Sequence, residues 1–246
     1  MPAHPAESVP ADLHAADPLA ADPLAADPLA MDNEYTLLEE IANAVTHGIG
    51  ALLSVGALAA LVALAVVDDD VWVLVSLTIY GATLVLLYLA STLYHAVRHA
   101  RAKLVFKTCD HAAIFLLIAG TYTPYCLLVM GGAWGWTLFA VMWSIAAFGV
   151  VFKILHVNRY ARLSLMLYLG MGWLGVFAIG PIIANMATEG VILLAVGGLA
   201  YTAGVAFFLW ESMPFNHAVW HLFVLAGSTC HFLSIYYYVA QGAVSA

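Results

Sequence analysis

Two histidines, His217 and His221, stand four residues apart within an apolar segment. On an α-helix that spacing puts both imidazoles on one face, about 6 Å apart, where they can bind one metal ion. The H-x-x-x-H pattern alone is weak evidence, but two unpaired imidazoles in apolar surroundings would be costly. The pair therefore predicts a metal site, and neutral imidazole ligands favour zinc, Zn²⁺.

His95 is the third predicted metal ligand. It closes another apolar segment and follows Ser91 by four residues, so the two side chains share a helix face. Three protein ligands leave the fourth zinc position for water, which is the arrangement of a catalytic zinc. Asp110 can hydrogen-bond that water with Ser91 in support, and we predict both as catalytic residues. The alternative role of Asp110 is to cap a helix N-terminus.

A polar stripe precedes the first apolar segment. Glu40, Asn43 and His47 are spaced i, i+3 and i+7, so they lie on one face of a helix. Acidic residues are favourable in the first turn of a helix, which accounts for Glu40 but leaves His47 unexplained. Because a histidine that enters lipid needs a partner, we expect this stripe to support the metal site.

Three further histidines are predicted to have roles other than metal binding. His99 lies in a basic stretch and is interpreted as an interfacial cation. His111 points about 100° away from Asp110 on a helix, so we expect it to pack beside the site and to contribute no ligand. His231 lies ten residues beyond His221, roughly 15 Å deeper, and is interpreted as a hydrogen-bonded core residue.

The composition requires a lipid environment for these segments. Hydrophobic residues make up 64% of the 246 residues, charged residues only 9%, and the mean hydropathy is +0.96. An ordinary soluble domain carries roughly a quarter charged residues. The N-terminal tail carries most of the net charge of −8, and no basic cluster suggests a nucleic-acid partner.

The hydropathy pattern predicts an all-α, polytopic membrane protein built as a bundle of seven transmembrane helices. Residues 1–32 contain a repeated Ala-Asp-Pro-Leu-Ala unit and are interpreted as a disordered, acidic, low-complexity tail. Residues 33–246 form the membrane domain, whose apolar segments are long enough to cross about 30 Å of hydrocarbon. The predicted spans are 44–67, 71–96, 108–130, 134–155, 162–186, 190–210 and 217–240.

The basic residues predict the orientation of the bundle. All seven fall between spans 2 and 3 or where spans 4 and 5 meet, at Arg98, Arg101, Lys103, Lys107, Lys153, Arg159 and Arg162. The positive-inside rule places both loops in the cytoplasm, so the N-terminus is cytoplasmic and the C-terminus outside. Every candidate site residue then lies at a cytoplasmic helix end, although the spans were drawn from hydropathy alone.

These motifs resemble those of the hemolysin III branch of the progestin and adipoQ receptor (PAQR) family, part of a wider group of membrane hydrolases that includes alkaline ceramidases. The resemblance covers about residues 35–241. It rests on an E-x-x-N-x-x-x-H segment (Glu40, Asn43, His47), an S-x-x-x-H segment followed by an aspartate (Ser91, His95, Asp110) and a later H-x-x-x-H segment (His217, His221).

The resemblance implies zinc bound by His95, His217 and His221, with Asp110 reaching it through water. It also implies seven helices in the cytoplasmic membrane with the N-terminus inside. One functional hypothesis is a zinc-dependent hydrolase of a lipid amide or ester, with membrane lipid as substrate. The alternative is a non-enzymatic protein of membrane homeostasis, a receptor-like protein or a cytolysin, in which zinc is structural. No feature of the sequence indicates an oligomeric state.

Overall fold

The computed structural model describes residues 35–68 and 70–241, and helices joined by short connections make up this part of the chain. The predicted tail at 1–32 lies outside the described residues. Seven helical segments are long and apolar enough to cross a membrane, in agreement with the predicted number of spans. Their bounds are Leu37–Val67, Val71–Ala96, Ala100–Met130, Gly132–His156, Ala161–Asn185, Thr188–Phe208 and Asn216–Ala240.

Four spans are single α-helices and three change helix type along their length. The single helices are α1 (Leu37–Asp68), α2 (Val71–Ala96), α4 (Gly132–His156) and α7 (Thr188–Phe208). The third span joins α3 (Ala100–Pro124) to a π-helix, Tyr125–Met130. The fifth joins α5 (Ala161–Trp173), a 3-10 turn Leu174–Ala178 and α6 (Ile179–Asn185). The seventh joins α8 (Asn216–Ser234) to a π-helix, Ile235–Ala240.

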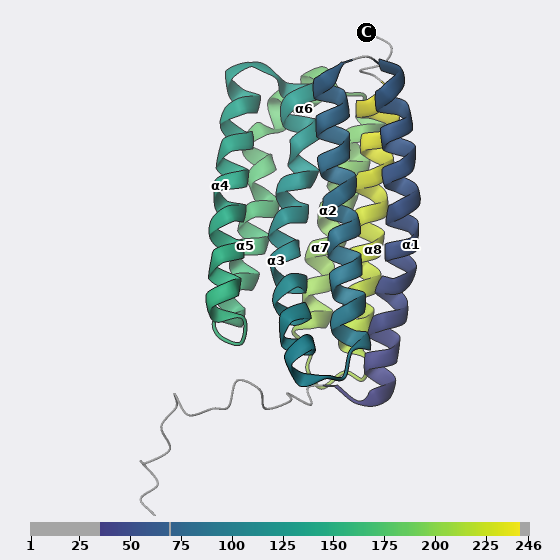
Figure 1. The fold of residues 1–246 in the computed structure, drawn as a ribbon. Helices are drawn as coiled ribbons and strands as arrows, with labels where there is room; N and C mark the ends of the chain where they lie inside the picture. Colours follow the sequence, from purple (N-terminus) through teal and green to yellow (C-terminus); the bar gives the residue numbers. More distant parts are fainter. Residues whose placement is uncertain (1–34, 69, 242–246) are drawn as a thin grey trace, which may run out of the picture. The chain divides into compact units, whose positions relative to one another are not determined.

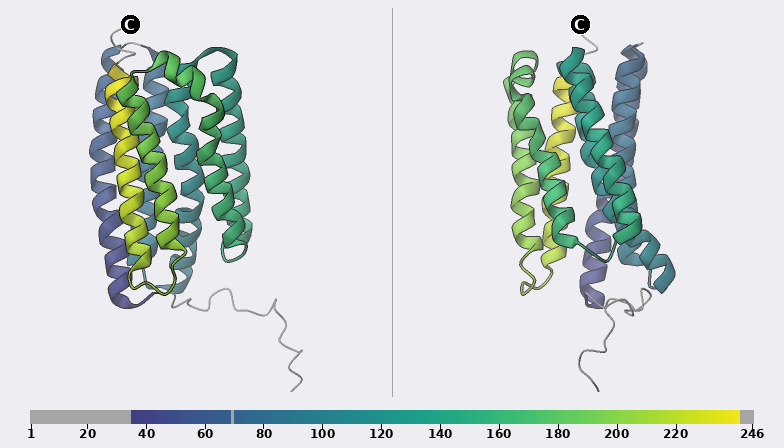
Figure 2. Two further views of the ribbon diagram at one scale, coloured as in Figure 1. Left: turned by 180° about the vertical axis from the view of Figure 1, so that it is seen from behind. Right: turned by 90° about the vertical axis from the view of Figure 1, so that its left-hand side faces the viewer.

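Helix α8, far along the chain, packs beside α1 and α7, and α2 lies between α1 and α3 (Figures 1 and 2). Helices α4 and α5 lie on the other side of α3. The interior is closely packed around fully buried side chains such as Leu77 and Ile235. Large apolar side chains cover the outside instead, as at Phe177, which is 83% exposed. Such an outer surface suits contact with lipid.

Helices α1 and α3 begin seven and eight residues before the predicted spans, and both early starts have a local cause. Helix α1 begins at Leu37 because Thr36 and Glu39 form a capping box, in which the Thr36 N–H donates to Glu39 Oε2 at 2.9 Å and the Glu39 N–H to Thr36 Oγ1 at 3.3 Å. Helix α3 begins at Ala100, where the His99 side chain accepts from a first-turn N–H. Asp110 therefore lies inside α3, and the alternative of an N-cap is wrong.

All seven basic residues lie at one end of the bundle, near the ends of α2 and α4 and the starts of α3 and α5 (the lower end in Figure 1). The starts of α1 and α8 lie at that same end. The candidate site residues are thus gathered at the basic end, as the topology predicts. Which side of the membrane this end faces stays a prediction from the basic residues.

The contact between α3 and α4 depends on the absence of a side chain at Gly149. A Cβ there would meet the Phe115 ring far inside van der Waals contact. We expect Gly149→Ala to lower the free energy of unfolding by about 1–3 kcal/mol, because the two helices must move apart. Thermal unfolding of the purified protein measures this change.

Gly170→Ala is the matched control, because a Cβ at that exposed helical position meets no atom within 4 Å. Its expected effect is a gain of about 0.5–1 kcal/mol from helix propensity. Equal unfolding temperatures for the two variants would contradict the assigned role of Gly149.

Candidate metal centre

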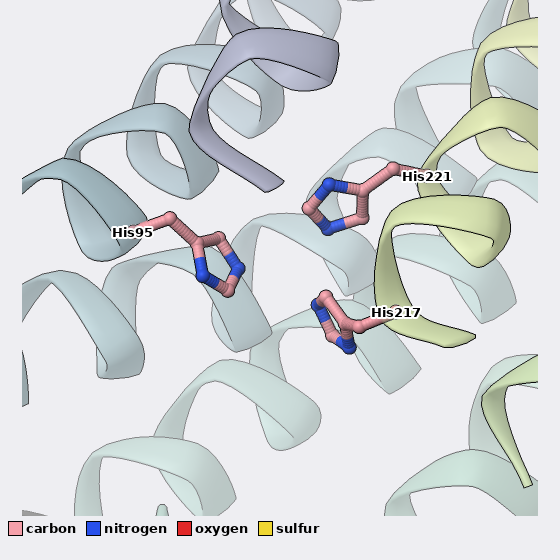
Figure 3. Close-up of side chains that lie close together, drawn as sticks. All are labelled: His95, His217 and His221. Atoms are coloured by element: carbon pink, nitrogen blue, oxygen red, sulfur yellow. The ribbon is translucent and has the colours of Figure 1, made fainter. Parts of the chain in front are cut away.

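Three imidazoles meet at the basic end of the bundle. His95 comes from the last turn of α2, and His217 and His221 come from the first two turns of α8. One ring nitrogen from each lies within 4.8 Å of the others, and the rings point toward a common centre (Figure 3). His95 and His221 are almost completely buried. The group predicted from the sequence therefore comes together, and it can hold one metal ion.

The start of α8 is held in place by neighbouring helices. Phe215 adopts the left-handed conformation, with φ of 57°, and its N–H donates to Glu39 Oε1 of α1 at 3.2 Å. The Asn216 amide donates to the Phe208 carbonyl at the end of α7, at 3.2 Å. These contacts fix the rotation of α8, so that His217 and His221 face the centre of the bundle.

Glu40 determines the tautomer of His95. Glu40 Oε2 lies 2.6 Å from His95 Nδ1, and Glu40 Oε1 accepts from Lys103 Nζ at 2.6 Å. A carboxylate beside an ammonium acts as acceptor, so Nδ1 of His95 carries the proton and the lone pair lies on Nε2. A carboxylate bonded to the outer nitrogen of a histidine is the usual support of a metal ligand.

The backbone of α1 determines the tautomer of His221. Nδ1 of His221 donates to the Asn43 carbonyl at 3.2 Å, because a carbonyl can only accept. Thr46 Oγ1 lies 3.1 Å from the same nitrogen and itself donates to main-chain carbonyls, so it is a second acceptor. The lone pair of His221 is thereby placed on Nε2. The His47 ring stacks on His221 at 3.4 Å between centroids.

Tyr35 completes the surroundings of the three imidazoles. Its hydroxyl lies 3.0 Å from His217 Nδ1, and its ring lies 5.0 Å from the His217 ring. Neither Tyr35 nor Thr46 was predicted as a site residue. The capping box beginning at Thr36 is the signal that could have found Tyr35, since it starts the helix well before residue 44.

The two predicted catalytic residues lie in a buried chain of polar groups beside the imidazoles. His47 Nδ1 lies 2.7 Å from Ser91 Oγ, and Ser91 is also a hydrogen-bond partner of the Asp110 carboxyl. With Asp110 ionised, protons can be ordered only one way, His47 to Ser91 to Asp110. Asp110 is not among the three mutually close ligand residues. Of the predicted support residues, His47 lies in this chain, whereas Glu40 contacts His95 and the Asn43 carbonyl accepts from His221.

Three further histidines, His99, His111 and His231, are not among the mutually close ligand residues. The His99 side chain caps α3, a role that the sequence analysis did not assign to it. The His111 ring lies 6.4 Å from the Tyr94 ring, and its Nδ1 is buried without a hydrogen-bond partner among the described residues. His231 Nε2 donates to the Leu194 carbonyl at 3.1 Å, within the core.

Comparison with known proteins agrees with these motifs. Residues 35–232 match the model of the family described as Haemolysin-III related. The chain belongs to this family. It is 49% identical over 205 residues to Hemolysin-3 of Bacillus cereus, an alignment that covers 83% of this chain and 94% of the relative. Hemolysin-3 homolog of Bacillus subtilis (strain 168) is 47% identical over 207 residues, 84% of this chain and 97% of that protein.

The family extends to vertebrate proteins. Monocyte to macrophage differentiation factor of Homo sapiens is 34% identical over 211 residues, covering 83% of this chain and 86% of the human protein. Together with the seven apolar helices, family membership makes this chain a multi-pass integral membrane protein. The resemblance drawn from the motifs to the hemolysin III branch is confirmed.

Replacement of Glu40 tests whether its carboxylate strengthens metal binding by the three imidazoles. We expect Glu40→Gln to weaken metal binding about 10- to 100-fold, because His95 loses an anionic acceptor at Nδ1. Competition with a chromogenic chelator measures the affinity. Glu189→Gln, an exposed change at the start of α7, is the control and should bind metal like the parent. Equal affinities for the two variants would refute the support role.

Proposed function

We propose that this hemolysin III family protein is a zinc-dependent membrane hydrolase that cleaves an amide or ester bond of a lipid. The observation that carries the proposal is a three-imidazole group with a buried carboxyl beside it. Two of the three imidazoles are held with Nδ1 protonated and the lone pair on Nε2. Nitrogens bound to a tetrahedral zinc at about 2.0–2.1 Å lie about 3.4 Å apart, so ring nitrogens that lie within 4.8 Å of one another need to approach by no more than about 1.4 Å.

The neighbouring residues suit hydrolysis. When bound, zinc supplies a Lewis acid that polarises a carbonyl and brings the pKa of a coordinated water to about 7. In the proposed reaction the Asp110 carboxylate takes the proton from the attacking water as general base. Ser91 orients that carboxylate through its hydroxyl, and His47 orients Ser91 from the other side. The proton on Asp110 then passes to the leaving amine or alkoxide.

A lipid substrate fits the position of the centre. The imidazoles lie at one end of helices that span the membrane, close to where lipid head groups meet acyl chains. An ester or amide bond lies at that depth in most lipids. The apolar outer surface of the bundle lets such a molecule approach from within the leaflet.

Structural zinc is the second candidate, and one observation favours it. The predicted ligands join α2 to α8, which are distant in sequence, and their hydrogen bonds tie both helices to α1. A metal at that junction would brace three helices without any turnover. The relatives named hemolysins add a cytolytic role as a further form of this non-enzymatic alternative.

Metal analysis of the purified protein tests the zinc site that both candidate functions require. We expect about one zinc per chain in the parent and a loss of nearly all of it in the His217→Ala/His221→Ala variant, because two of three ligands are gone. A parent protein without stoichiometric metal, after purification in the absence of chelators, would refute both candidates.

Asp110→Asn separates the two candidates. We expect release of fatty acid from synthetic lipid amides and esters to fall about 100-fold or more, because an amide cannot act as the general base, while zinc content stays unchanged. Asp70→Asn is the matched control at the opposite end of the bundle, where Asn also caps a helix well. A fully active Asp110→Asn enzyme would remove Asp110 from the mechanism. A parent without turnover would favour structural zinc.

A further inference from the structure

Asn43 has a buried side chain whose two polar atoms are both unpaired. The residue is completely buried, and neither Oδ1 nor Nδ2 has a hydrogen-bond partner among the described residues. Only its main-chain carbonyl is bonded, to His221 and to the Thr46 hydroxyl. A carboxamide brings two donor hydrogens and an acceptor oxygen, so its burial without partners is costly.

The local structure of α1 gives no reason for an asparagine at this position. Asn43 lies in the second turn of a helix that begins at Leu37, where asparagine is a poorer helix former than alanine. Asparagine is favoured at helix ends, where it caps free N–H groups, but Thr36 and Glu39 already cap α1. A residue that breaks such local rules without a gain in stability is typical of a functional site.

The residues on either side of Asn43 locate its side chain. Glu40, three residues earlier, contacts His95, and His47, four residues later, stacks on His221. Residues with this spacing share one face of a helix, so Asn43 lies on that face between the other two. Its carbonyl also accepts from His221, which puts this turn of α1 against α8. The carboxamide therefore faces the space that His95 and His221 border.

The donor hydrogens of this space are already used, except those of Asn43. His47 donates from Nδ1, so its buried Nε2 carries a lone pair and can only accept. The Thr46 hydroxyl donates to main-chain carbonyls of α1. The Nδ1 hydrogens of His95 and His221 are bonded to oxygens of α1. Within the described part of the chain, Asn43 Nδ2 therefore keeps two hydrogens for a bound molecule.

A free donor beside a hydrolytic centre suits the charge that hydrolysis creates. When the oxygen of water bonds to the carbonyl carbon of a lipid amide or ester, one C=O electron pair moves onto the carbonyl oxygen. The proton of the water passes to Asp110. The carbonyl oxygen is then an anion that accepts strongly from an N–H. When the C=O bond re-forms, the bond to the leaving group breaks, and that group takes the proton from Asp110.

We propose that Asn43 is a catalytic residue, whose Nδ2 donates a hydrogen bond to the oxyanion that forms on the substrate carbonyl. This role rests on the proposed function of the protein as a hydrolase. A donor that the fold has already buried needs no reorganisation when the charge develops. The carboxamide is unpaired in the protein alone because its best acceptor is the transition state.

The kinetics of Asn43→Ala test this role in the zinc-loaded full-length protein, with synthetic lipid amides as substrates. We expect kcat to fall about 100-fold and KM to stay within about twofold, because the lost bond forms mainly in the transition state. Zinc content should match the parent, since all three imidazoles remain. A variant with the kcat of an active parent would overturn the role of Asn43 and leave the hydrolase assignment intact. A parent without turnover would refute both.

Thermal unfolding separates a catalytic role of Asn43 from a structural one. Leucine has the same branched shape without polar atoms, so we expect Asn43→Leu to unfold at or above the parent temperature. Ser234→Ala is the matched control, because this equally buried hydroxyl donates to the Gly190 carbonyl at 2.8 Å and accepts from the Tyr125 hydroxyl at 2.9 Å.

The control should unfold about 2–4 °C below the parent and keep the parent kcat, because Ser234 loses real partners far from the imidazoles. A fall in the unfolding temperature of Asn43→Leu as large as that of Ser234→Ala would mark Asn43 as structural and overturn the proposal. This measurement needs no substrate, so it does not depend on finding the right lipid.

Discussion

The carboxylate of Glu40 is the interaction on which the arrangement of the candidate metal centre depends. It joins three helices, since Glu40 lies on α1, His95 on α2 and Lys103 on α3. Within a membrane there is no water to satisfy a polar group, so each must find its partner in the protein. One carboxylate shared by an imidazole and an ammonium meets that requirement for all three groups. It also aims the lone pair of His95 at the other two imidazoles.

Helix α1 positions the centre although it supplies none of the three imidazoles. Glu40 sets the tautomer of His95, the Asn43 carbonyl sets that of His221, and Glu39 accepts from the N–H of Phe215, the residue directly before α8. The Asn43 side chain and His47 Nε2, by contrast, are buried without hydrogen-bond partners among the described residues. Unsatisfied polar atoms are rare in folded proteins, so their presence beside the imidazoles is what a binding site would produce.

The sequence predicts the fold and the three imidazoles well, because both follow from simple constraints. Seven apolar segments must each cross the bilayer, and the spacing of His217 and His221 is set by the helix repeat. The early starts of α1 and α3 were missed, because hydropathy excludes their polar first turns. The contacts of Tyr35 depend on how α1 meets α8, and the burial of Phe115 depends on the fit of α3 to α4 at Gly149. Neither follows from spacing within one helix.

The buried carboxyl of Asp110 could balance the charge of a metal ion bound by the three imidazoles. Glu40 is already paired with Lys103, so its charge is balanced within the described residues. Asp110 has a hydroxyl partner in Ser91 and no ion pair in the same part of the chain, and it is almost fully buried. An isolated carboxylate in that position is costly, and a divalent cation held by neutral imidazoles close by is equally in need of negative charge. In the proposed function, a metal ion between His95, His217 and His221 would make the burial of Asp110 acceptable, and the Asp110 carboxylate would in turn balance the charge of the ion.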